Sequence, residues 1–158
     1  MYIYLLIFLL LIYTSFYYIF IDEISIYQVS INNFDFELLY KKQPIVISDT
    51  ISDINYILAN WFNYNIIYNL NNNYIWQKNK YKYLFVQSIS DNPVEIHLCN
   101  PSSKITNGIP DTDSNITSIL LNNKSIIIPF NWNYYISGNT NMYGIHDYIT
   151  ICTANLSN

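Results

Sequence analysis

The sequence predicts an α+β domain that is mainly β, a barrel or sandwich with two helices at its start and a single transmembrane helix before them. Three observations lead to this prediction. Residues 2–21 carry no charge, two segments before residue 62 repeat their apolar positions at helical spacing, and beyond Asn65 short apolar runs alternate with turn-forming residues. The 158-residue chain therefore divides into an anchor, residues 1–22, and one β domain, residues 23–158.

The N-terminal stretch predicts a transmembrane helix from Tyr2 to Ile21. A helix of this length reaches about 30 Å, the thickness of the hydrocarbon core. Aromatic residues crowd both of its ends, as they do at membrane interfaces. A cleaved signal peptide would have a basic start and a shorter apolar core, and a buried core helix is rarely apolar on all sides. We therefore expect a single-pass membrane protein with the lipid bilayer as a partner.

The sequence leaves open on which side of the membrane the β domain lies. No Lys or Arg precedes the span, whereas Lys41 and Lys42 follow it and favour the cytosolic side. Asn-X-Ser/Thr sequons at Asn115, Asn123 and Asn155 would be glycosylation sites in a lumen. In a chain this rich in Asn, such sequons arise by chance.

Two helices are expected at the start of the β domain. Asn32 or Asn33 can cap the first, and Pro44 ends it. The second helix carries its apolar stripe within residues 54–62, after Asp49 or Ser52 as its cap. Such a stripe is typical of a core-facing helix.

The expected strands are short runs of β-branched and aromatic residues, separated by turns of Asn, Pro and Gly. They lie at residues 24–31, 45–47, 66–68, 74–76, 83–86, 94–98, 116–121, 125–128, 132–136 and 148–152. Short strands at this spacing after two helices indicate an antiparallel sandwich or barrel.

The composition argues against nucleic acid as a partner. The formal net charge is −4, and all seven basic residues are lysines. A chain without arginine offers no bidentate fork for phosphate or guanine and no clustered basic face. Its 17 tyrosines and its many Ile and Asn residues indicate an AT-rich genome. Cys99 and Cys152 can pair in an oxidising lumen or remain buried thiols, and burial is the expected state.

Residues 125–136, SIIIPFNWNYYI, predict a corner between two strands. Pro129 cannot donate to a strand ladder, so it belongs at a strand end or a bulge. Trp132 brings a large apolar surface and one N–H that needs a partner. Tyr134 lies where the apolar run resumes. These three residues are expected to shape the wall of the sheet.

Three segments, in this order, resemble the cupin-like family that includes the JmjC-type Fe(II)/2-oxoglutarate oxygenases. Residues 36–53 are similar to its entry segment, in which a helix leads into a Pro-containing strand. Residues 83–102 resemble its hairpin ending in Leu-x-x-Pro, and residues 119–136 resemble its hairpin with Pro, two residues, Trp, one residue and His. The resemblance implies a double-stranded β-helix, and in active members an iron centre.

The resemblance also implies which residues an active member would need. These are a His-x-Asp or His-x-Glu pair, which this chain lacks, and a distal histidine, where this chain has Tyr134. Glu95 and His97 share a strand face but stand in reverse order. His146 and Asp147 are adjacent, so a strand would point them to opposite faces. We expect no catalytic, cofactor-binding or metal-binding residues, and these four are the remaining metal candidates.

No specific activity can be read from the sequence. The predicted function is a membrane-anchored, non-catalytic cupin-like module that binds a protein or a small ligand. A structural or interaction protein of a membrane, for example of a virion, is the first alternative. A non-haem oxygenase with an atypical metal set is the second. The chain is expected not to be an enzyme, and Fe(II) and 2-oxoglutarate are expected as cofactors only under the second alternative.

Overall fold

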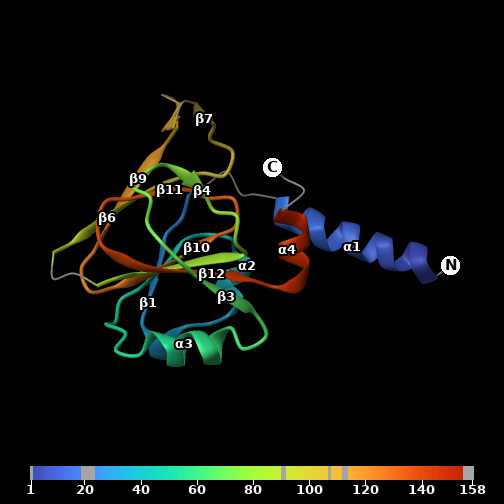
Figure 1. Ribbon diagram of the computed structural model, residues 1–158, viewed down its shortest axis with the longest axis horizontal. Coiled ribbons are helices and arrows are strands. Elements are labelled where there is room, and N and C mark those ends of the chain that lie inside the picture. The colour runs from blue at the N-terminus through green and yellow to red at the C-terminus, as the bar shows by residue number, and fades with distance from the viewer. Residues whose placement is uncertain (1, 19–23, 90–91, 107, 112–113, 155–158) are drawn as a thin grey trace.

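The computed structural model describes residues 2–18, 24–89, 92–106, 108–111 and 114–154, with the side chains of residues 16–18 and 152–154 left aside. A long N-terminal helix extends from a body made of two facing sheets (Figure 1). The helices are α1 (Tyr2–Tyr18), the 3-10 helix η1 (Ile31–Asn33), α2 (Glu37–Tyr40), α3 (Ile54–Trp61) and α4 (Tyr148–Ala154).

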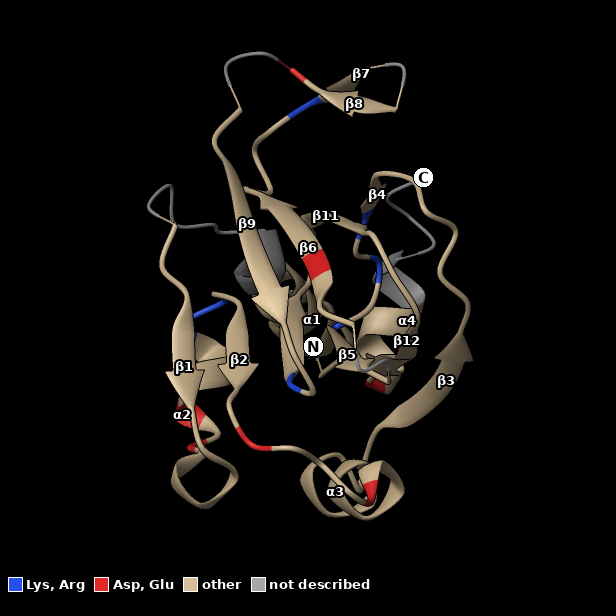
Figure 2. Ribbon diagram, turned by 90° about the vertical axis from the view of Figure 1, so that its left-hand side faces the viewer, with Lys and Arg blue, Asp and Glu red and all other residues tan. Residues whose placement is uncertain are grey.

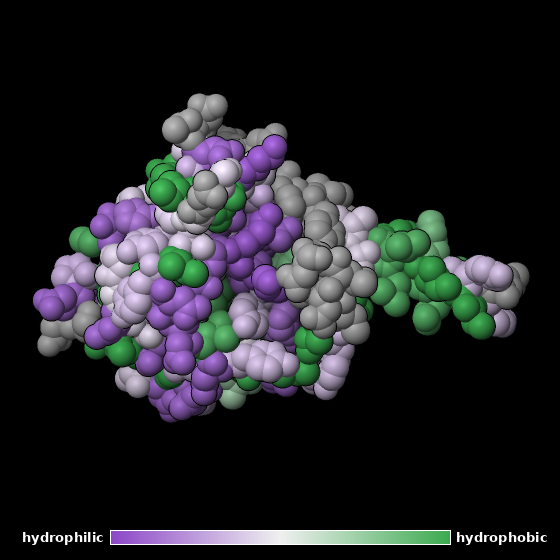
Figure 3. All heavy atoms as spheres, turned by 45° about the horizontal axis from the view of Figure 1, so that its top comes forward, coloured by the Kyte–Doolittle hydropathy of each residue, from purple (hydrophilic) through white to green (hydrophobic). Residues whose placement is uncertain are grey.

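Helix α1 is apolar on all sides, and its side chains from Tyr2 to Leu11 are exposed. It forms a hydrophobic arm in Figure 3. Among the described residues, no helix has both the length and the apolar character needed to cross a membrane. Residues 19–21 of the predicted span lie outside the described ones. The predicted transmembrane anchor from Tyr2 to Ile21, and with it the single-pass membrane localisation, is therefore wrong.

The mainly β, α+β class is confirmed. A six-stranded mixed sheet has the order β1-β2-β10-β5-β12-β3, and a four-stranded antiparallel sheet has the order β4-β11-β6-β9. The first sheet contains β1 (Tyr27–Val29), β2 (Ile45–Ile47), β3 (Ile66–Leu70), β5 (Tyr83–Ser88), β10 (Ser125–Pro129) and β12 (Thr140–His146). The second contains β4 (Gln77–Lys78), β6 (Val94–Cys99), β9 (Ile116–Leu121) and β11 (Asn133–Ile136). A small hairpin, β7 (Ile105–Thr106) and β8 (Ile109–Pro110), stands beside them.

The two sheets face each other, but the described strands do not close into a barrel. The chain passes repeatedly between them: β3, β5, β10 and β12 belong to the larger sheet, and β4, β6, β9 and β11 to the smaller one. The parallel pair β1–β2 extends the larger sheet beyond β10. The barrel alternative is thus not realised, and the sandwich is.

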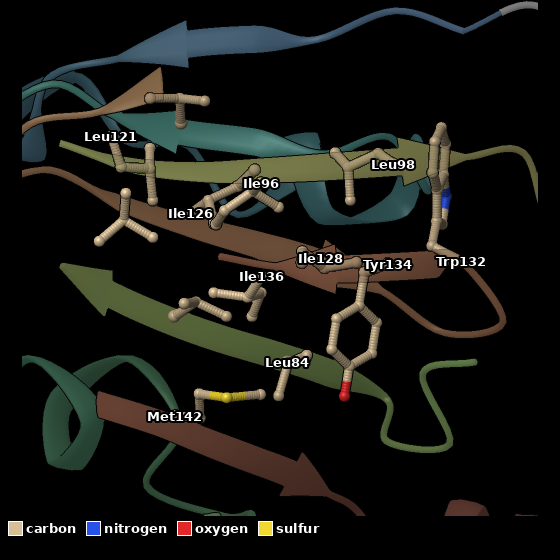
Figure 4. Close-up of a cluster of buried hydrophobic side chains, with 13 residues drawn as sticks. Leu84, Ile96, Leu98, Leu121, Ile126, Ile128, Trp132, Tyr134, Ile136 and Met142 are labelled. Atoms are coloured by element: carbon tan, nitrogen blue, oxygen red, sulfur yellow. The ribbon is translucent and has the colours of Figure 1, made fainter. Parts of the chain in front are cut away.

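Alternation along the strands divides the core into two apolar clusters. On β5, Leu84 and Val86 point into the space between the sheets, where they meet residues of β6, β10 and β11 (Figure 4). Phe85 points to the opposite face and packs under α3 with Ile127 and Ile145. The larger sheet therefore has a buried surface on both of its faces.

Several local predictions differ from the structure. Asn32 and Asn33 lie in η1, so they do not cap α2, which begins only at Glu37. Helix α3 is capped by Asp53, whose carboxylate accepts a hydrogen bond from the Tyr56 backbone N–H at 3.1 Å. Neither Asp49 nor Ser52 has this role.

The C-terminal prediction is wrong as well. Residues 148–152 were expected to form a strand, but they form α4, and the strand of this region is β12. The Asp147 carboxylate accepts a hydrogen bond from the Thr150 N–H at 2.7 Å, and the Thr150 hydroxyl accepts one from the Asp147 N–H at 3.0 Å. This reciprocal pair is the geometry of a helix start, and it outweighs the strand preference of the apolar residues.

Candidate functional site

The four metal candidates lie in two separate places. Glu95 and His97 are on the outer face of β6, where the His97 Nε2 lies 3.8 Å from a Glu95 carboxylate oxygen. The His97 Nδ1 lies 2.7 Å from the Ser118 hydroxyl of β9. The rings of Trp76 and Tyr135 lie beside the imidazole. The surroundings of His97 are therefore a surface cluster of hydrogen-bonding and aromatic side chains.

His146 and Asp147 lie at the end of β12, in the other sheet. The imidazole of His146 is buried, 4.8 Å from the ring of Tyr81, and its Nδ1 lies 3.2 Å from the Thr150 hydroxyl. Burial lowers the pKa of His146, while the charge of Asp147 acts in the opposite direction. Since the two pairs occupy different sheets, the structure does not bring the four candidates together. Within the described ranges no group of three or more His, Cys, Asp or Glu side chains could hold a metal ion. The expected lack of a cofactor stays a prediction.

Tyr134, at the position of the expected distal histidine, points into the core between the sheets. Only 4% of its surface is exposed, and it packs among Leu84, Leu98 and Ile128 (Figure 4). Burial raises the pKa of its phenol. The inner face at this position is thus apolar packing.

The corner formed by Pro129 and Trp132 is held by hydrogen bonds whose partners the sequence did not indicate. The buried Asn79 donates through its side-chain nitrogen to the carbonyls of Ile128, at 2.9 Å, and Pro129, at 2.8 Å. The Trp132 indole N–H donates to the Lys42 carbonyl at 2.9 Å, which ties the corner to the end of α2. No motif marks Asn79, because its role depends on carbonyls fifty residues away.

A pocket of about 440 Å³ opens beside this corner, on the side away from the smaller sheet. We call it the corner pocket, and it lies between α1, α2, β5 and the end of β10. Its walls are mainly aromatic and apolar, and two lysines complete them. The lining residues are Tyr13, Leu39, Tyr40, Lys42, Lys82, Tyr83, Pro129 and Phe130. A volume and a lining of this kind are typical of small-molecule sites.

An ion pair fixes one wall of the corner pocket. The Lys82 ammonium lies 2.7 Å from the Asp147 carboxylate, and the Tyr13 hydroxyl donates to the same carboxylate oxygen at 2.7 Å. Burial acts to raise the pKa of Asp147, but the hydrogen bonds from Lys82, Tyr13 and Thr150 outweigh it and hold this pKa below its usual range. Asp147, a metal candidate in the sequence, thus serves here as the counter-ion of Lys82.

The second lysine gives the corner pocket its electrostatic character. Partial burial removes the Lys42 ammonium from some of its water, and this burial lowers its pKa. The seven lysines of the chain fall at residues 41–42, 78–82, 104 and 124, and Lys42 and Lys82 line this pocket. Figure 2 shows lysine positions, in blue, at several separate places in the fold. The lining of the corner pocket therefore combines an aromatic body with two ammonium groups, of which that of Lys82 is paired with Asp147.

Comparison of the chain with protein-family models, with curated proteins and with solved structures gives no match. The expected membership of the cupin-like or JmjC-type family, preceded by a transmembrane anchor, is therefore wrong. It was based on three short segments, and a chain dominated by Ile, Asn and Tyr matches short motifs of these residues by chance.

Proposed function

We propose that this chain is a non-catalytic binding module and that its corner pocket takes a small organic anion with an aromatic or otherwise apolar body. The position of the open cavity in the fold supports this proposal most directly. The interior between the sheets is filled by apolar side chains, including Tyr134, whereas the corner pocket outside them is open and carries two lysines.

The order of the strands supports a finer description of the fold. Eight strands, β3 to β6 and β9 to β12, form two four-stranded layers with the orders β3-β12-β5-β10 and β4-β11-β6-β9. Antiparallel strands that alternate between two sheets in this way form a double-stranded β-helix, the jelly-roll arrangement of cupins. We propose this fold for the body. In it the corner of Pro129 and Trp132 joins one strand of each layer.

The proposed ligand follows from the chemistry of the lining. The rings of Tyr13, Tyr40 and Tyr83 offer apolar surface, which favours a flat hydrophobic body. The ammonium groups of Lys42 and Lys82 favour a carboxylate, because a cation that has lost part of its hydration gains most from a charged partner. A neutral ligand of the same shape would make no charge-assisted contact with these ammonium groups.

Calorimetric titration with 2-naphthoate and with the uncharged 2-naphthalenemethanol tests the proposal. We expect the naphthoate to bind at least tenfold more tightly, since a charge-assisted hydrogen bond contributes about 1.5–3 kcal/mol. Lys42→Gln should remove this preference, and Lys104→Gln, at the start of the small β7–β8 hairpin, is the matched control. Equal binding of the two probes, or oxygen uptake by the chain with Fe(II) and 2-oxoglutarate, would contradict the proposal.

A structural or interaction module without a ligand site is the second candidate. The exposed apolar side chains of α1 favour it, because so much apolar surface on one arm is typical of a surface that meets a partner. Under this candidate neither naphthyl probe would bind in the corner pocket, and Tyr40→Ala would leave both titrations flat.

A further inference from the structure

A second depression lies at the far end of the larger sheet, where β3 and β12 separate. Their last paired residues are Leu70 and Met142, while β12 continues back to Thr140 alongside β5. Beyond Leu70 the chain turns away, which leaves a groove of about 650 Å³ between the diverging segments. We call it the amide groove.

The lining of the amide groove is neutral and rich in side-chain amides. Half of its twelve lining residues are asparagines, and none carries a charge. They come from α3, from β3 and the loop after it, and from the start of β12: Asn55, Asn69, Asn71, Asn72, Asn139 and Asn141. Each amide offers both a donor and an acceptor, so together they match a ligand that carries both.

Hydrogen bonds within the protein hold one wall of the amide groove in place. Asn72 donates to the carbonyls of Ile136, at 3.0 Å, and Gly138, at 3.1 Å, and its oxygen accepts from the Tyr74 backbone N–H. The Tyr74 hydroxyl donates to the Asn139 oxygen at 3.1 Å. None of these bonds uses the Asn139 amide nitrogen. The wall is therefore built before a ligand arrives, with donor capacity left at its rim.

The Thr140 hydroxyl is not one of the polar groups that the amide groove offers. Its Oγ1 is closed to solvent, and the buried Ser88 hydroxyl lies on the residue directly opposite it on β5. The polar groups that a ligand in the groove can reach are therefore the asparagine side chains.

We propose that the amide groove binds a neutral, polyhydroxylated ligand, a sugar unit of a glycan. Sugar hydroxyls donate and accept at once, as the asparagine amides do, and the rings of Tyr74 and Tyr143 provide apolar surface for the C–H face of the sugar. A phosphate or nucleic acid would need cations, and a metal ion would need carboxylates. Neither kind of side chain lines this groove.

The test uses the full chain and neutral trisaccharides, namely maltotriose, cellotriose and chitotriose, with glucose 6-phosphate as the charged comparison. We expect at least one trisaccharide to bind in a calorimetric titration with a Kd below about 1 mM, and salt to leave it unchanged because no ion pair is involved. Failure of all three trisaccharides, or tighter and salt-dependent binding of glucose 6-phosphate, would overturn the proposal.

Asn141→Ala distinguishes binding from folding. It removes one amide from a half-buried position in the lining, so the midpoint of urea unfolding should change little, while trisaccharide affinity falls about fivefold or more. Asn141→Asp should weaken binding similarly, and Asn115→Asp, outside the groove, should not. Unchanged affinity in Asn141→Ala would sink the idea. Because naphthoate binding uses other residues, Asn141→Asp should leave that titration intact, which separates this inference from the proposed function.

Discussion

Asn79 offers the sharpest test of how the corner is held. Its side chain is 1% exposed, donates to the carbonyls of Ile128 and Pro129, and accepts from the Tyr81 N–H at 2.9 Å. Asn79→Ala removes all three bonds, although the Pro129 carbonyl keeps the backbone N–H of Trp132 as a donor at 3.5 Å. At about 1 kcal/mol for each bond, the free energy of unfolding should fall by about 3 kcal/mol.

The assay is urea unfolding followed by tryptophan fluorescence, since Trp132 lies in the same corner. With a urea dependence of about 1–3 kcal/mol per M, the midpoint should fall by about 1–3 M. Asn60→Ala is the control, because Asn60 is exposed and makes one hydrogen bond to the Tyr56 carbonyl. A midpoint shift in Asn79→Ala no larger than in this control would refute the reasoning.

Asn79→Asp adds a pH dependence of known sign. A carboxylate at this position would face the carbonyl oxygens of Ile128 and Pro129, so its pKa in the folded state would be raised above the unfolded value of about 3.9. Stability relative to the wild type should therefore be highest below pH 4 and decrease as the pH rises through the folded pKa. The same urea assay at pH 4 and pH 7 measures this difference, and an unchanged gap would contradict it.

Three further predictions concern other parts of the fold. Asp147→Asn should lower the free energy of unfolding at pH 7 by about 1–2 kcal/mol, because the hydrogen bonds to the carboxylate are charge-assisted. Since the folded-state pKa of Asp147 is depressed, this stabilisation is present above the unfolded carboxyl pKa and disappears as the pH falls, so the variant and the wild type should converge in strong acid. Burial raises the pKa of Cys99 to about 11, so in a Cys152→Ser background a thiol reagent at pH 8 should react slowly until urea is added, and immediate reaction would disprove the burial. Gly144→Ala should cost about 1–3 kcal/mol in urea unfolding, because its new methyl group would meet the Tyr81 ring at 2.4 Å, and Tyr81→Ala should restore part of the loss.

The strands that the sequence predicted correctly are those whose pattern is local. Val94 to Leu98 alternate between apolar and polar side chains, and Ser125 to Ile128 form a short buried run, so neither needs distant information. Strand β12 was missed because Gly144 weakens its pattern. A side chain at position 144 would collide with the Tyr81 ring, which lies more than sixty residues earlier in the sequence.

The residues of the candidate site also divide into those with a local signal in the sequence and those that depend on distant contacts. Pro129 and Trp132 could be singled out because proline and tryptophan have strong local consequences in a strand. The pairing of Lys82 with Asp147 and the common pocket of Lys42 and Lys82 could not be predicted, since only the tertiary fold brings these segments together. For α1, uniform apolarity was read correctly, and the described helix covers Tyr2–Tyr18, whereas residues 19–21 of the expected span lie outside the described residues.

The hydrogen bond between Tyr13 and Asp147 joins positions 134 residues apart. It connects α1 with the residue that precedes α4, at the rim of the corner pocket. An expression fragment trimmed to start after α1 would therefore lose more than an apolar helix: it would lack one side of the corner pocket and the phenol that shares the Asp147 oxygen with Lys82. Ligand screens on such a fragment would sample a different cavity from the one the whole polypeptide builds.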